Sequence, residues 1–460
     1  MVELRLNQLV NKMDGHLLQG SPALSFHEFN IDSRMTKPGE LFFALVAERN
    51  GHDFILQAAQ KGAAGAVISQ DIHPPHNQFA LVRVDDTILA LQKLAKEVLA
   101  EHDVQIVGIT GSIGKTTTKE FAAALLDPPF KVLKSEGSYN NHIGLPLSIL
   151  KLQEDHDIAV LEMGMNHAGE IKRLTEIASP QIALITNIQP VHLEFFKSLE
   201  DIAMAKKEIL DGMDSDGRVV LNGDDKWVMR IAEAWKGEKI LFGLSTNCDV
   251  HAKDIRIEGF KGMSFELYYG GKKERITLPF FYQTTLFNYL AAVALCYAFA
   301  LPFEDILAKT RSLELYKMRG TVLHLEQDMT LIDDSYNSNP VALQYILKNV
   351  AQLPGQRKVA VLGDMLELGE QSEKYHRLAG EQVVKYGFDF LVTVGTLSRH
   401  MAEAALASGM SGECVHSFDN SDEAAERLWS LLAKGDLILI KGSRGIKMEK
   451  IASSLKKRGN

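Results

Sequence analysis

The stretch "GITGSIGKTTTKE", residues 108–120, follows the apolar run "VQIV" (104–107) and leads into a helix-forming segment. Glycines, a lysine and hydroxyl side chains between a strand and a helix are typical of a nucleotide phosphate loop, whose usual pattern is G-x-x-x-x-G-K-[ST]. Here Ile109 stands where the first glycine is expected, and Gly111 lies inside the loop. The stretch therefore predicts a nucleoside triphosphate ligand, but it does not identify the reaction.

The residue types of this loop suit phosphate oxygens. Glycines let backbone amides approach phosphate closely, and the N-terminus of the following helix adds favourable partial charge. Lys115 is expected to reach the β- and γ-phosphates, and the hydroxyl of Thr116 to bind Mg²⁺. The alternative is a plain glycine turn with a lysine on the surface. Nucleotide contacts are expected from Gly111, Ser112, Gly114, Lys115, Thr116 and Thr117.

Short β-branched apolar runs alternate with helical patterns along the rest of the chain, which favours βαβ units and parallel sheets. Polar, glycine or acidic residues follow most of these runs, at the strand ends where open α/β sheets bind ligands. The fold class is therefore α/β, with a smaller module in residues 1–100 and two doubly wound domains in 101–313 and 314–460. The expected strands are 39–45, 63–69, 104–110, 158–164, 182–188, 218–222, 330–335, 359–364, 390–395 and 437–442.

Composition excludes several classes of protein. The chain has 460 residues and a net charge of −9 without a long basic block, which argues against binding to nucleic acid or to an anionic membrane. Its three cysteines, at positions 248, 296 and 414, have neither paired nor metal-type spacing and fit a reducing cytoplasm. The N-terminal stretch carries charged residues among its apolar ones, unlike a signal peptide.

One uncharged stretch, residues 280–303, approaches the length of a membrane-spanning helix. Gln283, Thr284, Thr285 and Asn288 fill its first third and leave too short an apolar run. We expect a buried helix of a large core instead.

Three further residues follow predicted strands or lie on a predicted helix in the middle of the chain. Glu162 ends an apolar run beside the loop strand, where a Mg²⁺ ligand belongs, although it would equally suit a helix cap. His192 follows a strand and a loop, and such a histidine is often structural. Lys206 lies in "AMAKKEI", where a lysine is usually only solvated.

In the last third, "DDSYNSNP" (333–340) and "KGSRG" (441–445) each end a strand. Asp334 and Tyr336 are suited to bind a ribose and cover an adenine, whereas Asn339 and the following proline would suit the start of a helix. The second segment has the composition of an anion site, and a plain turn is its alternative.

Taken together, these motifs resemble the Mur ligases of peptidoglycan synthesis, in the order of that family and over nearly the whole chain. The N-terminal segment "IDSRMTKPGELFFALVAERNGHDF" (31–54) is similar to the family's UDP-binding segment. The other matching segments are "TGSIGKTTTK", "NNHIGLPLSIL", "LEMGMNHAGEI", "VHLEFFKSLEDIAMAKKEI", "DDSYNSNP" and "LGDMLELG".

The resemblance implies an N-terminal UDP-binding module, a central ATPase domain and a C-terminal Rossmann-like domain. Within the family, "GDMLELG" and "DSYNSNP" are most similar to the member that uses ATP to join D-Ala-D-Ala to UDP-MurNAc-tripeptide through an acyl phosphate. The resemblance also implies that two Mg²⁺ ions and a lysine carbamate formed from CO₂ take part. It implies a cytoplasmic monomer without nucleic-acid or membrane partners.

Site residues carry over by position. The resemblance places Thr116 and Glu162 on Mg²⁺, His192 at a second Mg²⁺, and Lys206 at the carbamylated lysine. Lys115, His192 and Lys206 are then the catalytic set. Further nucleotide contacts are implied for Asn288, Arg319, Asp334 and Tyr336, and substrate contacts for Ser33, Arg34, Asn50, His52, Asn140, Asn141, Asn337, Lys441 and Arg444.

Two positions depart from the family pattern. Thr284 and Thr285 stand where a His-Asn pair is expected before "NYLAA", and Ile113 stands where asparagine is expected in the loop. Adenine recognition is the property these changes affect. The alternative functions are a diamino-acid-adding Mur ligase, folylpolyglutamate synthase, and a nucleotide-binding homologue without ligase activity.

Overall fold

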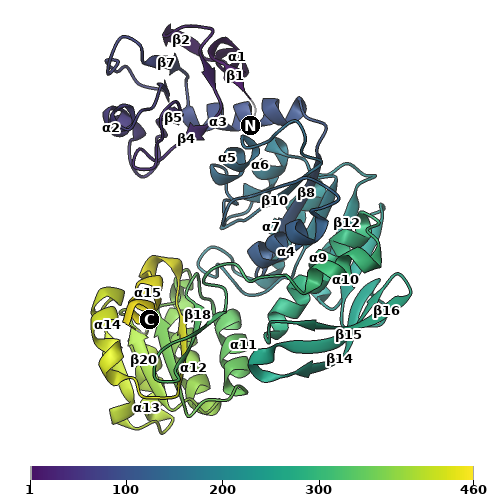
Figure 1. Cartoon of the computed structure of the whole chain (residues 1–460), viewed down its shortest axis with the longest axis vertical. Coiled ribbons are helices and arrows are strands. Elements are labelled where there is room, and N and C mark those ends of the chain that lie inside the picture. The colour runs from purple at the N-terminus through teal and green to yellow at the C-terminus, as the bar shows by residue number, and fades with distance from the viewer. Residues whose placement is uncertain (1–2, 459–460) are drawn as a thin grey trace.

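The computed structural model describes residues 3–458, and its strands form a two-stranded ribbon and sheets of five, nine and six strands. Figure 1 shows the three larger sheets as three successive bodies, with the N-terminal domain at the top and the C-terminal domain at the lower left. The predicted three-domain α/β fold is confirmed. The domain limits near residues 100 and 314 stay predictions.

The N-terminal domain is a small mixed sheet. The predicted strands at 39–45 and 63–69 are confirmed in shorter form as two neighbouring parallel strands. In sheet order the strands are β2 (His16–Gln19), β7 (Ala80–Arg83), β6 (Gly65–Ile68), β5 (Leu41–Phe43) and β4 (Phe29–Asn30), and β1 (Leu4–Arg5) pairs with β3 (Ser25–Phe26). The helices are α1 (Leu6–Lys12), α2 (Ile55–Gln60) and α3 (Thr87–Ala100).

The central domain is built on the nine-stranded sheet. In sheet order its strands are β16 (Lys272–Leu278), β15 (Met263–Tyr269), β14 (Val250–Ile257), β13 (Lys239–Gly243), β12 (Arg218–Asn222), β11 (Ile182–Ile185), β8 (Gln105–Thr110), β10 (Ile158–Glu162) and β9 (Val132–Lys134). Its helices are α4 (Lys115–Leu126), α5 (Gly144–Ile149), α6 (Glu170–Ile177), α7 (Leu199–Asp211), α8 (Lys226–Ile231), α9 (Gln283–Ala298) and α10 (Phe303–Thr310).

The four strands expected in the middle of the chain are confirmed as β8, β10, β11 and β12, all parallel to their neighbours. Strand β8 lies between β10 and β11, so the direction of chain winding reverses on either side of it. Ligands of open α/β sheets bind at such a switch point, outside the carboxyl ends of the strands. The loop after β8 therefore opens into the crevice of the sheet.

Alternating side chains explain why both faces of this sheet are covered. Along β10, Ala159 and Leu161 belong to one buried cluster, whereas Ile158 and Val160 belong to another that also holds α4 and α9. Successive strand residues point to opposite faces. A continuous apolar run thus needs helices on both sides, which is the doubly wound arrangement.

The uncharged stretch at 280–303 contains α9 (Gln283–Ala298), and most side chains of this helix are buried, as predicted. Tyr289 is fully buried, and its hydroxyl lies 2.8 Å from Thr310 Oγ1. Among residues 3–458, no helix is both long enough and apolar enough to span a bilayer.

The C-terminal domain carries the six-stranded sheet. In sheet order its strands are β17 (Thr321–His324), β18 (Thr330–Asp334), β22 (Asp436–Lys441), β19 (Arg357–Gly363), β20 (Phe390–Val394) and β21 (Val415–Phe418). The four predicted strands are confirmed as β18, β19, β20 and β22. Helices α11 (Pro340–Ala351), α12 (Ser372–Lys385) and α13 (Arg399–Ala407) cover one face, and α14 (Ser421–Arg427) and α15 (Glu449–Arg458) cover the other.

Candidate active site

The phosphate loop joins β8 to α4 through two left-handed glycines. Gly111 has φ +144° and Gly114 has φ +89°. A Cβ at Gly111 would lie 1.9 Å from Thr186 Oγ1, and one at Gly114 would lie 2.1 Å from Asn288 Oδ1. Both positions therefore require glycine for space as well as for conformation.

Side chains of the loop take different directions. Lys115 Nζ donates to the carbonyl of Gly111 at 2.9 Å, so the lysine folds back over the loop. Ser112 Oγ instead donates to Gln189 O at 3.1 Å and accepts from the amide of the same residue at 2.9 Å. The Ser112 hydroxyl thus holds the loop to the segment after β11. The amides of the first turn of α4 have no partner within the helix and are available to an anion.

We expect Gly111→Ala to weaken nucleotide binding by about tenfold or more, because backbone strain of about 1–3 kcal/mol adds to the clash with Thr186. Titration with a fluorescent ATP analogue measures the change. Gly169→Ala is the matched control, since Gly169 has φ +87° and an added Cβ there meets nothing within 4 Å. Equal affinities for Gly111→Ala and wild type would contradict the assignment of the loop.

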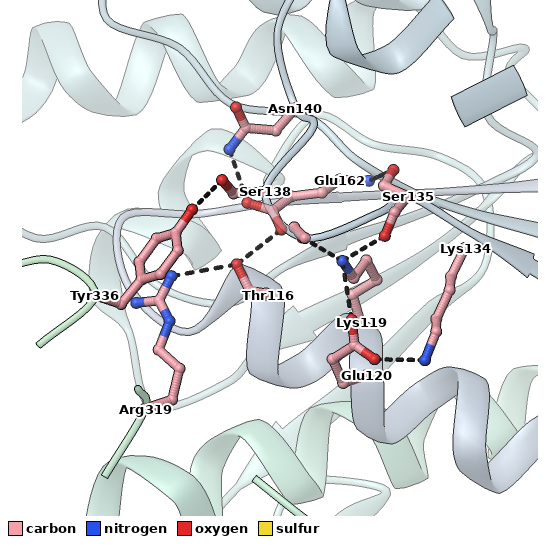
Figure 2. A network of polar contacts seen from close by, with 11 residues as sticks. Thr116, Lys119, Glu120, Lys134, Ser135, Ser138, Asn140, Glu162, Arg319 and Tyr336 are labelled. Carbon is pink, nitrogen blue, oxygen red and sulfur yellow. Dashed lines mark hydrogen bonds and ion pairs between the residues drawn. The ribbon is translucent and has the colours of Figure 1, made fainter. Parts of the chain in front are cut away.

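Thr116 and Glu162 meet at the edge of the sheet, as Figure 2 shows. Thr116 Oγ1 donates to Glu162 Oε2 at 2.9 Å, and Asn140 Nδ2 donates to Glu162 Oε1 at 2.8 Å. The Glu162 side chain is buried. The family resemblance places Thr116 and Glu162 on Mg²⁺, and the structure brings the two side chains together.

The pair fits Mg²⁺ in chemistry and spacing. Octahedral Mg²⁺ with oxygen ligands at about 2.0–2.1 Å places neighbouring ligand oxygens about 2.9 Å apart. The distance from Thr116 Oγ1 to Glu162 Oε2 is 2.9 Å. Among residues 3–458, no group of three or more His, Cys, Asp or Glu side chains is arranged to hold a metal ion. A Mg²⁺ here would therefore depend on hydroxyl and phosphate oxygens as well.

A buried lysine that the sequence analysis missed supports this pair. Lys119 is fully buried, and its Nζ donates to the carbonyls of Ser135 at 2.6 Å and Gly137 at 2.5 Å. Ser135 Oγ in turn accepts from the amide of Glu162 at 3.0 Å. Lys119 thus ties α4 to the segment that carries Asn140 (Figure 2). Its signal in the sequence was its place one helical turn after Lys115.

Lys119→Met should lower kcat/KM for the UDP substrate that the sequence resemblance implies by about tenfold or more, because each buried carbonyl left without a donor costs about 1–3 kcal/mol. Nucleotide affinity should stay within about threefold, since the loop itself is unchanged.

Lys134→Met is the control. Lys134 pairs with Glu120, the carboxylate that also lies 3.1 Å from Lys119, but the Lys134 side chain is half exposed. Exposed pairs contribute about 0–1 kcal/mol, so little change is expected there. Steady-state kinetics and nucleotide titration measure both variants. Equal effects of the two substitutions would contradict the role of Lys119.

Lys115, Thr116 and Glu162 line one cavity. The C-terminal domain contributes Arg319 and Tyr336 to it. The Tyr336 hydroxyl is hydrogen-bonded to Ser138 Oγ. The Arg319 guanidinium lies 4.0 Å from the Tyr336 ring centre, and its Nη2 lies 3.4 Å from Thr116 Oγ1. Arg319 of the third domain therefore reaches Thr116 of the phosphate loop, whereas Tyr336 reaches Ser138 in the segment after β9 (Figure 2).

Lys441 and Asp334 form an ion pair at the ends of β22 and β18. Lys441 Nζ lies 2.5 Å from Asp334 Oδ2 and 2.9 Å from the carbonyl of Asn337. Burial raises the pKa of Asp334, whereas the charge of Lys441 and its hydrogen bond lower it. Arg444 lies 3.2 Å from Glu449 and 5.4 Å from the Tyr336 ring centre. Of these groups, Asn337, Lys441 and Arg444 line the cavity, and their contacts with a substrate stay predictions.

The charges of Lys206 and of the half-buried Lys115 are close enough to affect each other. Lys206 on α7 is only 1% exposed, and burial lowers its pKa well below the usual range, with the charge of Lys115 lowering it further. Burial also lowers the pKa of Lys115, an effect that Glu162 opposes. Lys207 is ion-paired with Asp211 instead. Of the two lysines of α7, Lys206 alone thus has the environment of a reactive neutral amine.

His192 lines the same cavity as Thr116 and Glu162. Its backbone has φ +55°, and its Nδ1 lies 2.6 Å from Oε2 of Glu367 in the C-terminal domain. The hydrogen bond from His192 lowers the pKa of Glu367. Glu367 was part of the "GDMLELG" motif but was not a predicted site residue.

The residues proposed for the base separate into two cavities. Asn288 and Thr284 line a second cavity together with Ile113, Trp227 and Tyr345, whereas Tyr336 lines the first. The sequence predicts that Tyr336 covers the adenine, but a base held beside Asn288 would leave Tyr336 near the phosphates instead. Thr285 is buried.

The predicted N-terminal substrate residues have hydrogen-bond partners within their own domain. Ser33 Oγ donates to Gln57 at 2.6 Å, Arg34 pairs with Asp32, and Asn50 Oδ1 lies 2.8 Å from His52 Nδ1. The cavity between this domain and the central domain is lined by other residues, among them Asp32, Met35, Lys37, Tyr139 and Lys151.

Asn141 and Asn339 have capping roles. Asn141 Oδ1 accepts from Gly144 N at 2.8 Å, at the start of α5, although a substrate contact was predicted. Asn339 Oδ1 accepts from Ala342 N at 2.8 Å, so the alternative of a helix start at Asn339 is confirmed.

Comparison with known proteins places this site in a family. The model of the Mur ligase middle domain matches residues 109–296, and that of the Mur ligase, glutamate ligase domain matches residues 318–444. The UDP-N-acetylmuramoyl-tripeptide–D-alanyl-D-alanine ligase of Bacillus subtilis (strain 168) is 35% identical over 431 residues, which cover 93% of each chain. The chain belongs to the Mur ligase family.

Solved Mur ligases share the whole fold. MurF from Acinetobacter baumannii superposes with a TM-score of 0.88 at 30% identity, covering 99% of each chain. The MurF ligase from Thermotoga maritima in complex with ADP gives a TM-score of 0.77 at 28% identity, covering 94% of this chain and 98% of that one. The resemblance to the Mur ligases, and to MurF among them, is confirmed.

Proposed function

We propose that this Mur ligase joins D-Ala-D-Ala to UDP-MurNAc-tripeptide, with ATP as the source of energy and ADP and phosphate as products. The relatives that match the chain over nearly its full length are named for this activity. The single structural observation that supports it most is the cavity in which the phosphate loop, the Thr116–Glu162 pair and Arg319 of the third domain meet.

The chemistry needs such a cavity. A carboxylate is a poor electrophile because its leaving group would be oxide. Transfer of the γ-phosphoryl group to the tripeptide carboxylate breaks the bond to ADP and forms an acyl phosphate. The dipeptide amine then attacks the acyl carbon, phosphate leaves, and the amine loses a proton. Cations must offset the negative charge where carboxylate and γ-phosphate approach each other.

The residues of the chain divide this work. Lys115 and the amides at the start of α4 bind the phosphates, and Arg319 approaches from the third domain. Asn140 orients the Glu162 carboxylate. Thr116 and Glu162 would hold one Mg²⁺ and His192 a second, and these ions would supply neutralising charge. Docking of the C-terminal domain excludes water from the acyl phosphate.

We propose that the side chain of Lys206 is carbamylated by CO₂. A bare ammonium would repel both Lys115 and Mg²⁺, whereas a CO₂ adduct turns the side chain into an anionic oxygen ligand. Only the neutral amine reacts with CO₂, and the burial that lowers the Lys206 pKa favours that form. Carbamylation forms an N–C bond to CO₂ and releases one proton.

The acceptor test distinguishes the members of the family. Phosphate release from ATP and Mg²⁺ with UDP-MurNAc-tripeptide should require D-Ala-D-Ala, and mass spectrometry should show the pentapeptide product. Release with single amino acids such as diaminopimelate or glutamate would favour the diamino-acid-adding or folylpolyglutamate-type alternatives. ATP binding without turnover on any acceptor would favour the inactive homologue.

We expect Lys206→Ala to lower kcat by more than about 100-fold, beyond the range of residues that only support a metal ligand. High bicarbonate should not restore activity, whereas short carboxylates such as formate should restore part of it. Lys206→Met fills the same space without the costly buried amine, so its thermal midpoint should equal or exceed that of the wild type. Activity of Lys206→Ala within twofold of wild type would remove the carbamate from the account.

A further inference from the structure

Three consecutive residues of the central domain contact one loop of the C-terminal domain. His192 Nδ1 lies 2.6 Å from Glu367 Oε2, and the amide of Glu194 donates to the carbonyl of Glu367 at 3.2 Å. Between them, Leu193 packs against the apolar cluster of the C-terminal domain that includes Leu368. We call residues 192–194 the docking segment. Polar and apolar contacts together make this more than an isolated surface ion pair.

Backbone conformation on both sides is unusual at the contact. His192 has φ +55° and Glu367 has φ +61°, in the left-handed region that side chains other than glycine rarely adopt. Gly369 has φ +53°, and a Cβ there would lie 3.1 Å from Glu194 Cα. Such conformations persist where the surrounding structure holds them, and they are frequent at functional sites.

The C-terminal loop is held by its own domain. The amide of Leu366 donates to Ser443 Oγ at 2.9 Å, and the amide of Met365 donates to His376 Nε2 at 3.0 Å. These hydrogen bonds fix the backbone of the loop that carries the Glu367 carboxylate. It meets His192 only because the two domains are docked against each other.

We propose that Glu367 is a positioning residue that orients the His192 imidazole when the C-terminal domain docks, so that phosphoryl transfer is coupled to docking. The inference rests on the proposed function, because it assigns His192 a place beside the phosphates. A carboxylate that accepts from Nδ1–H fixes the tautomer and leaves Nε2 as the nitrogen free to bind a cation. The central domain alone lacks this carboxylate, so an undocked enzyme has a poorly oriented ligand and hydrolyses little ATP.

The test compares Glu367→Ala and Glu367→Gln with Glu370→Gln, an exposed carboxylate three residues further along the same loop. Glu367→Ala should lower kcat by about 10–100-fold, the range for loss of a partner that orients a metal-bound histidine. Glu367→Gln keeps an acceptor for Nδ1–H and should lose less. Glu370→Gln should stay within twofold of wild type.

A second readout does not depend on turnover. Binding of Mn²⁺ in the presence of a non-hydrolysable ATP analogue, followed by electron paramagnetic resonance, should weaken in Glu367→Ala by about 10-fold or more. Unchanged kcat and unchanged Mn²⁺ affinity in this variant would overturn the proposal. If the wild type has no turnover with D-Ala-D-Ala, the proposed function fails, while the Mn²⁺ measurement still tests Glu367.

A double-mutant cycle separates orientation of His192 from a general structural role. If Glu367 acts through His192, Glu367→Ala should have no further effect on Mn²⁺ affinity in a His192→Ala background. Losses that add in the double variant would show that Glu367 acts independently of His192, and would overturn the proposal.

Discussion

The hydrogen bond between Thr116 and Glu162 is the contact on which the rest of the site depends. It joins the first turn of α4 to the end of β10, two elements brought together because β8 and β10 are neighbours at the switch point of the sheet. The remaining groups are arranged around it: Asn140 on the other carboxylate oxygen, and Arg319 beside the hydroxyl. A site that binds two anionic substrates requires several cationic side chains and oxygen ligands. These come from several segments, because each segment can supply only one or two such side chains.

Much of this arrangement could be predicted from the sequence, because parallel strands buried on both faces leave continuous apolar runs and the loop needs glycine. The antiparallel strands β14, β15 and β16 were missed, since β14 and β16, which flank the mostly buried β15, are partly exposed and rich in charge, as in "KKERITL" (272–278). The roles of Lys119 and Glu367 could not be predicted from the sequence either. A buried or interdomain partner of a charged side chain is set by tertiary contacts that no local pattern records.

Two predicted residues show the converse limit. Asn141 lies in a family motif, but its side chain caps α5, and Ser112 lies in the phosphate loop, but its hydroxyl bonds to the segment after β11. Motifs record structural and functional residues alike. Lys206 is the opposite case, since an ordinary helical lysine in the sequence is buried beside Lys115 in the structure. That placement costs stability, and a chemical role is its most direct explanation.

The central claim is that this cavity transfers a phosphoryl group to a carboxylate. The most direct measurement uses UDP-MurNAc-tripeptide labelled with ¹⁸O in its terminal carboxylate, with ATP, Mg²⁺ and D-Ala-D-Ala, and mass analysis of the released phosphate. Each phosphate formed from a fully labelled carboxylate should carry one ¹⁸O atom, and the adenine nucleotide product should be ADP. Unlabelled phosphate, or release of AMP and pyrophosphate, would contradict it.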